Sequence, residues 1–260
     1  MLKNIITLFQ YKDLIVALVV RDLKARYKNS VLGYAWTWLD PLLTMCVFIL
    51  IFGIVLNIKT EYFPIYLLSG LVPWMFFDRS INNCVGSISS NAWLINRIYF
   101  PREIFPLTLI LGPAVNLLLS FIVIIPLILI YGLPLTPKIL LLPAAFFLLF
   151  LLTMGVGLGF AYFSVYFRDM DYIVPFIVRL LFYLTPIFYV IEGRIPTNYL
   201  DLYMILNPLA VILSFFRSCL MGYPLPLLKY IITCSVICGL VFYGGYTIFK
   251  NFEDRMIKRI

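Results

Sequence analysis

The stretch RDLKARYKNSVLGYAWTWLDPLL, residues 21–43, determines how this chain is built. Its cations all precede Ser30 and are Arg21, Lys24, Arg26 and Lys28. From Val31 onward the residues are apolar or aromatic, apart from small or polar ones and the pair Asp40–Pro41. Lys and Arg next to an apolar run are typical of the place where a chain turns from a membrane surface into the bilayer. The stretch therefore predicts an interfacial helix followed at once by a transmembrane helix.

The composition places the whole chain in a membrane. Hydrophobic residues make up 63% of it and charged residues only 12%, whereas a soluble domain carries roughly twice that share of charge, about 25%. Long unbroken apolar runs favour helices over a barrel, whose strands give short alternating segments. We expect an all-α integral membrane protein.

Six apolar runs are long enough to cross the bilayer, since a transmembrane helix needs roughly 20 apolar residues to span about 30 Å of hydrocarbon. They lie near residues 35–57, 64–84, 106–131, 139–164, 172–191 and 227–249. The sequence therefore predicts two parts. Residues 1–29 form a cytoplasmic interface helix, and residues 30–260 form one domain of six transmembrane helices.

The basic residues outside these runs predict the orientation. With the N-terminus in the cytoplasm, the cytoplasmic side receives Lys3, Lys12, Arg21, Lys24, Arg26, Lys28, Arg97, Arg102, Arg168, Lys250, Arg255, Lys258 and Arg259. The other side receives Lys59, Lys138, Arg194, Arg217 and Lys229. Because cytoplasmic loops carry the excess of Lys and Arg, we expect both termini in the cytoplasm.

The longest external segment, residues 192–226, does not look like a soluble loop. Its part Tyr199–Gly222 is apolar but is interrupted by Asn207–Pro208. Non-helical backbone at membrane depth is tolerated where it is buried in protein or lines a water-filled cavity. This pattern predicts two half-length helices that dip into the outer leaflet between the fifth and sixth spans.

The sequence contains little of the usual equipment of an enzyme. It has no histidine and no glycine-rich phosphate loop that ends in Lys-Ser or Lys-Thr, so it offers neither the commonest general base nor that type of nucleotide site. Gly155, Gly157 and Gly159 lie inside an apolar run. In that setting alternate glycines favour close helix packing over dinucleotide binding.

Asp40 is the carboxylate that most invites a functional interpretation. It lies ten residues after Ser30, about 15 Å along a helix. An ionisable residue at such depth in a membrane usually has a function. The alternative is that the first span begins below the bilayer, so that Asp40 stays among hydrated headgroups, and the sequence leaves both open.

Aromatic residues make up 17% of the chain. Most aromatic residues of membrane proteins face lipid or anchor the helix ends at the interface. Rings also stack on the apolar faces of sugars, and their hydroxyl groups form hydrogen bonds. A glycan channel is therefore an alternative, with Tyr34, Trp36, Trp38, Asp40, Tyr66, Trp74, Phe77 and Tyr183 as its candidate lining.

The cytoplasmic segment Asn91–Pro106, NAWLINRIYFPREIFP, is short, aromatic and basic. Its prolines restrict the continuation of a helix. The residues alone are compatible with an ordinary interfacial loop and with a helix on which a cytoplasmic partner docks.

Six motifs follow one another in an order that is similar to one transporter family. They are residues 21–43, LLSGLVPWMFF (67–77), NAWLINRIYFPREIFPL (91–107), YFSVYFRDMDYIV (162–174), LTPIFY (184–189) and LNPLAVILSFFRSCLMG (206–222). The chain resembles, over nearly its whole length, the permease subunits of bacterial polysaccharide ABC exporters, which move O-antigen, capsule or teichoic acid chains. Nothing in it resembles the soluble carbohydrate-binding module of some such systems.

The resemblance implies a transport subunit and not an enzyme. Two copies form the pathway as a homodimer in the bacterial inner membrane, and two copies of a separate cytoplasmic ATPase bind ATP and Mg. The substrate is a polyprenyl-diphosphate-linked polysaccharide, with O-antigen as the first candidate. No catalytic residue, metal or cofactor is expected on this chain, and no nucleic acid partner.

The resemblance also implies roles for individual residues. The segment that couples to the ATPase comprises Trp93, Leu94, Asn96, Arg97, Tyr99, Phe100, Arg102 and Glu103. The cations Arg21, Lys24, Arg26 and Lys28 either attract the lipid diphosphate or anchor the helix at the inner leaflet. Arg168 and Asp169 form a second cytoplasmic turn near the ATPase, and Asn207, Pro208 and Arg217 belong to the external gate.

Two other functions remain as alternatives. One is an ABC exporter permease for small lipids or drugs. The other is a membrane-embedded lipid-modifying enzyme, which needs clustered carboxylates or a metal site. The dispersed aspartates Asp40, Asp78, Asp169 and Asp171 argue against this enzyme.

Overall fold

The computed structural model describes residues 9–28, 30–55, 62–95, 97, 100–134, 136–191 and 196–253, and within these ranges it is helical and has no strand. The long helices are α2 (Lys12–Tyr27), α3 (Trp36–Phe48), α4 (Phe63–Cys84), α6 (Ile104–Ile130), α7 (Leu142–Tyr166), α8 (Met170–Leu184), α9 (Thr197–Leu206), α10 (Pro208–Met221) and α11 (Leu228–Asn251). The short ones are η1 (Gly33–Ala35), η2 (Ile49–Val55), η3 (Ser89–Asn91), α5 (Ala92–Ile95) and η4 (Pro137–Leu141). The expected all-α class is confirmed.

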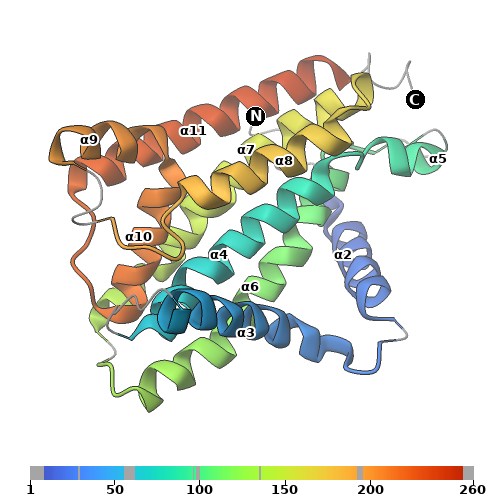
Figure 1. Ribbon diagram of the computed structural model, residues 1–260. Helices are drawn as coiled ribbons and strands as arrows, with labels where there is room; N and C mark the ends of the chain where they lie inside the picture. The colour runs from blue at the N-terminus through green and yellow to red at the C-terminus, as the bar shows by residue number, and fades with distance from the viewer. Residues whose placement is uncertain are drawn as a thin grey trace.

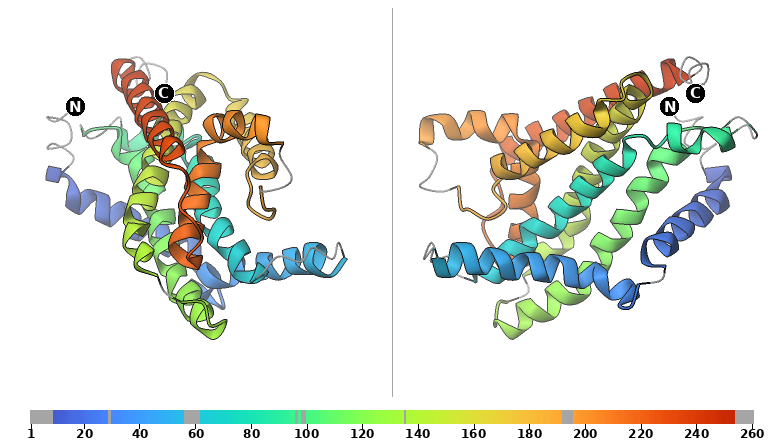
Figure 2. Two further views of the ribbon diagram at one scale, coloured as in Figure 1. Left: turned by 90° about the vertical axis from the view of Figure 1, so that its left-hand side faces the viewer. Right: turned by 45° about the vertical axis from the view of Figure 1, so that its right-hand side comes forward.

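The helices form a slanted bundle in which α7 lies along α11 and α4 lies along α6 (Figure 1). The start of α2, α5 and the end of α11 lie at one end of the bundle, and the connection from α6 to α7 lies at the other (Figures 1 and 2). Helix α2 packs on the side of α6, while α3 crosses α4 and α6 and continues away from the bundle (Figure 2).

Length and apolar composition identify membrane-spanning candidates. The segments Gly33–Val55, Ile104–Ile130, Pro137–Tyr166 and Leu228–Asn251 qualify singly, and the bent pair of α9 and α10 qualifies as a unit. The predicted span at residues 64–84 is the helix α4, whose second half carries Asp78, Arg79 and two asparagines. The predicted span at residues 172–191 is helical only as far as Leu184, about 22 Å from the start of α8. The count of six spans therefore stays a prediction.

A proline explains why α8 ends early. Thr185 has an extended backbone with φ −97° and ψ 139°, and the next residue is Pro186. A residue before proline is pushed out of the helical region by a clash with the proline ring. The chain therefore leaves the helix within the predicted span and continues as the irregular segment that packs under α3 and α4.

The N-terminal helix turns into α3 as expected. Helix α2 lies within the predicted range 1–29, of which residues 1–8 and 29 are outside the described part, and it packs on α6 through the buried side chain of Leu18. The turn that follows includes Gly33, whose φ of +51° suits a residue without a Cβ atom. Whether α2 lies at the membrane interface stays a prediction.

Glycines hold α7 and α11 backbone to backbone. A Cβ atom on Gly155 would lie 2.6 Å from the Cα atom of Phe242, and one on Gly245 would overlap the carbonyl of Gly155. A Cβ atom on Gly157 would lie 2.9 Å from the sulfur of Cys84 on α4. Small residues let helices in lipid approach closely and gain van der Waals contact. The expected packing role is confirmed for Gly155 and Gly157, while Gly159 faces open space.

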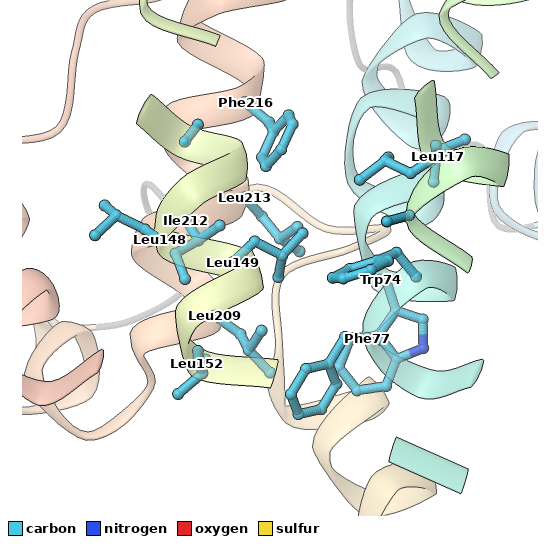
Figure 3. Close-up of a cluster of buried hydrophobic side chains, with 14 of the residues drawn as sticks. Trp74, Phe77, Leu117, Leu148, Leu149, Leu152, Leu209, Ile212, Leu213 and Phe216 are labelled. Carbon is cyan, nitrogen blue, oxygen red and sulfur yellow. The ribbon is translucent and has the colours of Figure 1, made fainter. Parts of the chain in front are cut away.

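The apolar core lies where α4, α7 and α10 meet (Figure 3). Leu148, Leu149 and Leu152 of α7 face Leu209, Ile212, Leu213 and Phe216 of α10, and Trp74 and Phe77 of α4 lie beside them. Trp74 is only 5% exposed and Phe77 only 3%. These two rings, predicted from the sequence to line a channel, therefore belong to the packed interior of the single chain.

The glycine contact gives a test with an internal control. We expect Gly155→Ala to lower the free energy of unfolding by about 1–3 kcal/mol, because the added methyl group overlaps α11. Gly159→Ala instead keeps or raises stability by up to about 1 kcal/mol, because alanine is the better helix former. Thermal unfolding in detergent micelles measures both variants. Equal shifts in the two midpoints would contradict the packing assignment.

Candidate functional site

A cationic groove lies in the corner between α2 and the start of α3, a corner that is visible in Figure 1. Its volume is about 890 Å³, and its lining is Ala17, Val20, Arg21, Lys24, Ala25, Lys28, Gly33 and Tyr34. Arg21 and Lys24 lie three residues apart on one face of α2, and Lys28 follows at the C-cap of this helix. The groove thus has a floor of small apolar residues and an edge of cations.

Three of the four cations predicted from the sequence line the groove. Arg21, Lys24 and Lys28 line it, whereas Arg26 is exposed elsewhere on α2. Arg21 also pairs with Asp22 at 2.8 Å, but its side chain is 52% exposed, and such surface pairs contribute little. Tyr34, predicted as a channel residue, lies on the groove with 49% of its surface exposed. This arrangement suits an anionic group attached to an apolar chain.

Asp40 of α3 forms an ion pair with Arg79 of α4. The Asp40 side chain is 44% exposed and that of Arg79 is 25% exposed. An ion pair lowers the cost of both charges in lipid, and this one connects α3 to α4. The sequence identified Asp40 but gave no sign of its partner, because the two residues lie on different helices.

The other predicted channel residues fall into two groups. Tyr66 and Trp38 are engaged within the chain: the phenol of Tyr66 donates to the carbonyl of Tyr189 at 2.7 Å, and the indole of Trp38 donates to that of Leu119 at 3.0 Å. Trp36 and Tyr183 are 42% and 61% exposed. Among the predicted channel residues, only Trp36, Tyr183 and Tyr34 present their rings to the outside of the chain.

An aromatic cluster that the sequence did not reveal joins the first span to α8. Phe48 and Phe52 stack with ring centroids 5.7 Å apart, Phe52 stacks on Phe188 at 4.7 Å, and Phe48 meets Phe182 at 5.9 Å. The spacing of Phe48 and Phe52, four residues apart on one helical face, was the available signal. The cluster fixes the non-helical segment after α8 against the end of the first span.

The predicted coupling segment has an exposed part. Trp93, in the single turn α5, is 60% exposed, and the guanidinium of Arg97 lies 6.0 Å from its ring centroid. Leu94 beside them is partly buried against the core. Asn96 and Tyr99 lie outside the described residues. Trp93 and Arg97 are therefore available for contact with another protein.

The rest of the coupling segment faces inward. Phe100 is buried against the ring of Phe105 at 5.3 Å. Arg102 pairs with Glu253 at 3.3 Å, and the buried Glu103 pairs with Lys250 at 3.4 Å. Lys250 also pairs with Glu253 at 2.7 Å. These four charges, the ion-pair quartet of Arg102, Glu103, Lys250 and Glu253, tie the start of α6 to the end of α11.

Arg168 and Asp169, which the sequence analysis expects in a cytoplasmic turn, are both exposed. Asp169 occupies the N-cap position of α8, where its carbonyl accepts from the amides of Tyr172 and Ile173. The turn lies at the end of the bundle that carries α5 and the end of α11 (Figure 1). Exposure and position leave these residues open to contact with a second protein.

The predicted break at Asn207–Pro208 is confirmed, with Tyr199–Leu206 and Pro208–Met221 bent by 93°. The Oδ1 atom of Asn207 accepts from the amide of Ala210 at 3.2 Å, and its Nδ2 atom donates to the carbonyl of Leu184 at 3.2 Å. A proline at the first helical position and an asparagine cap both favour a helix start at this point. One side chain therefore begins α10 and holds it to the end of α8.

Arg217 of α10 is only 4% exposed. Its Nη2 atom donates to the carbonyl of Ile187 at 2.8 Å, and its guanidinium lies 3.7 Å from the ring centroid of Tyr66. A cavity of about 280 Å³ adjoins it, lined also by Ser214, Ser218, Tyr223 and residues 190–191. Arg217 thus ties α10 to α4 and to the segment after α8.

The comparisons with known proteins agree with one another. Residues 13–221 match the profile of the ABC-2 type transporter family. The chain is 27% identical over 260 residues, all of both chains, to the O-antigen export system permease protein RfbA of Myxococcus xanthus. It is 32% identical over 213 residues, 81% of each chain, to RfbA of Klebsiella pneumoniae. It is also 29% identical over 220 residues, 82% of this chain and 83% of the relative, to the polysialic acid transport protein KpsM of Escherichia coli.

The ion-pair quartet leads to a test of stability. We expect Lys250→Met to lower the free energy of unfolding by about 3 kcal/mol, because it removes the partner of the buried Glu103 carboxylate. Lys229→Met removes the exposed pair with Asp201, whose side chains are 56% and 59% exposed, and is expected to change stability by less than about 1 kcal/mol. Thermal unfolding in detergent compares the two. A smaller loss for Lys250→Met than for Lys229→Met would refute a stabilising quartet.

Proposed function

Because this chain belongs to the ABC-2 type transporter family, we propose that it is the permease half of an exporter that moves a polyprenyl-diphosphate-linked polysaccharide outward across the bacterial inner membrane. In this family the ATPase is a separate subunit and the permease is not an enzyme. ATP and Mg therefore belong to the partner. Relatives that are named for O-antigen export support a polysaccharide as the cargo, with O-antigen as the first candidate.

The cationic groove is the observation that carries the proposal for a lipid-linked substrate. A polyprenyl diphosphate combines an anionic head with a long apolar tail. Arg21, Lys24 and Lys28 supply charge for the head, while Ala17 and Val20 supply an apolar floor for the tail. Basic clusters at the inner leaflet attract anionic lipid headgroups. The groove lies where the first span begins, so a bound lipid would hold its glycan beside the transport pathway.

The pathway itself requires a second copy of the chain in this proposal. Helix α8 presents an apolar and aromatic surface, with Tyr172 81%, Phe176 59%, Tyr183 61% and Leu184 60% exposed. A homodimer would bring the exposed rings of Trp36 and Tyr183 toward a shared channel, where rings offer stacking surfaces to sugars. Both termini lie in the cytoplasm, and α4 and α8 complete the six spans.

ATP hydrolysis reaches the membrane through the coupling segment. Trp93 and Arg97 form the surface on which the ATPase docks, with Arg168 and Asp169 as a second contact. Arg102 and Glu103 do not touch the ATPase in this proposal. They pass its movement to α11 through Lys250 and Glu253, because buried ion pairs resist separation. At the other end, α9 and α10 form the re-entrant pair that closes the external mouth, with Asn207, Pro208 and Arg217 as its fixed points.

The groove proposal predicts different effects for two charge reversals on α2. Lys24→Glu should abolish most export and trap lipid-linked glycan on the inner leaflet, because it places an anion where the diphosphate binds. Arg26→Glu changes the total charge equally but lies outside the groove, so export should stay close to the unmodified level. Surface glycan and lipid-linked intermediate are measured in a strain whose export depends on this chain. Equal losses for both variants would favour simple anchoring at the membrane.

If Trp93 and Arg97 form the docking surface, a substitution there should weaken binding of the ATPase without changing the stability of the permease. Arg97→Glu should remove most of the ATPase that copurifies with the permease, while the unfolding midpoint of the permease stays unchanged, since Arg97 is exposed. Lys12→Glu, an exposed reversal at the start of α2, is the matched control. Normal copurification of the ATPase with the Arg97→Glu variant would remove this residue from the interface.

A further inference from the structure

Asn116 is a polar side chain in the middle of the otherwise apolar helix α6. Its side chain is 5% exposed, and neither its Oδ1 nor its Nδ2 atom has a hydrogen-bond partner among the described residues. A carboxamide can accept two hydrogen bonds and donate two. Leaving such a group buried and unsatisfied is unfavourable. The position therefore calls for a hydrogen-bonding ligand.

A cavity of about 20 Å³ adjoins Asn116 at the junction of α3, α4 and α6. Its polar lining consists of Thr37, Arg79, Asn116 and Ser120, and the remaining lining includes Pro41, Val72, Met75 and Pro113. A water molecule needs a cavity volume of roughly 10–15 Å³ and two to four polar partners. The cavity therefore has room for one water molecule and supplies four polar side chains around it.

A second small cavity on the same interface makes a useful contrast. It measures about 10 Å³, and its lining of Trp38, Pro41, Leu42, Leu68, Val72, Ser120, Val123 and Ile124 is largely apolar. Small apolar cavities stay dry. The two cavities share Pro41, Val72 and Ser120, but only the first is also lined by the polar side chains of Thr37, Arg79 and Asn116. These three polar groups mark the first cavity for hydration.

The hydrogen-bonding capacity around the first cavity fits a water molecule. The hydroxyl of Ser120 donates to the carbonyl of Asn116 at 2.8 Å, which leaves its oxygen able to accept. The Nδ2 atom of Asn116 is a donor and its Oδ1 atom an acceptor, so a water molecule can serve both. Arg79 contributes a cation that is already paired with Asp40. A second cation is therefore a poor ligand for this site, whereas a neutral molecule that both donates and accepts is a good one.

We propose that the cavity between α3, α4 and α6 binds one ordered water molecule, held by the carboxamide of Asn116. This water extends the Asp40–Arg79 ion pair to α6. Together with the hydrogen bond from the indole of Trp38 to the carbonyl of Leu119, this water molecule adds polar contacts to the attachment of α3. The attachment of α11 to α7 is different, since there backbone meets backbone at Gly155 and Gly245.

Hydroxyl-radical labelling of the full chain in lipid nanodiscs tests the site, because X-ray pulses generate radicals from bound water and oxidise the side chains beside it. Met75 lines the cavity. When the solvent is exchanged for water enriched in oxygen-18, part of the oxygen that Met75 gains should stay unlabelled, because the bound water molecule exchanges slowly with the solvent. Asn116→Leu, which is similar in size but apolar, should reduce labelling of Met75 several-fold. Met204, which is 9% exposed and lies outside the cavity, should not change.

The control variant is Asn83→Leu, the same chemical change on α4 outside the cavity, which should leave Met75 labelling intact. Equal labelling of Met75 in the unmodified chain and in Asn116→Leu would overturn the proposal, and so would the absence of labelling in the unmodified chain. If Asn116→Leu does not fold, electron cryo-microscopy of the unmodified chain decides. A density peak within hydrogen-bond distance of the Asn116 carboxamide supports the water site, and a cavity without one refutes it.

Discussion

The structure depends on how a chain with only 12% charged residues pairs the charges that its helices carry. Such charges must be paired or must reach water. Asp40 pairs with Arg79 across α3 and α4, and Glu103 pairs with Lys250 across α6 and α11. Each pair joins helices that are distant in sequence, so the requirement that makes these charges costly also determines which helices stay together.

Two kinds of helix contact follow, and they divide the molecule. Helices α7 and α11 meet through glycine backbone, and α4, α7 and α10 share an apolar core that leaves little room for movement. The helix α3 and the segment before α6 add ion pairs and single hydrogen bonds to the aromatic contacts of Phe48 and Phe100. In the proposed transporter, the lipid-binding groove and the ATPase surface both belong to these polar attachments. The rigid core then serves as the frame against which they move.

Local patterns in the sequence were enough to predict the helical class, the helix before the first span, the break at Asn207–Pro208 and the packing role of Gly155. Each depends on residues that are close in sequence. The partners of Asp40 and Arg102 were not predictable, because a pairing between distant residues leaves no local pattern. The burial of Trp74 and Phe77 within the chain was not predictable for a related reason: an aromatic residue in a span looks the same whether it faces a channel or the core. The early end of α8 at Pro186 was visible in the sequence but was outweighed by the apolar run around it.

Reconstitution into liposomes tests the central claim, which is that this chain forms the path for a lipid-linked glycan while another subunit supplies the energy. The measurement is the ATP-dependent transfer of a labelled polyprenyl-diphosphate oligosaccharide across the bilayer, with the permease and its ATPase present together or separately. The account predicts transfer only when both are present, and no ATP hydrolysis by the permease alone. ATP hydrolysis by the isolated permease, or ATP turnover by the complex that moves small lipids but never the glycan, would contradict it.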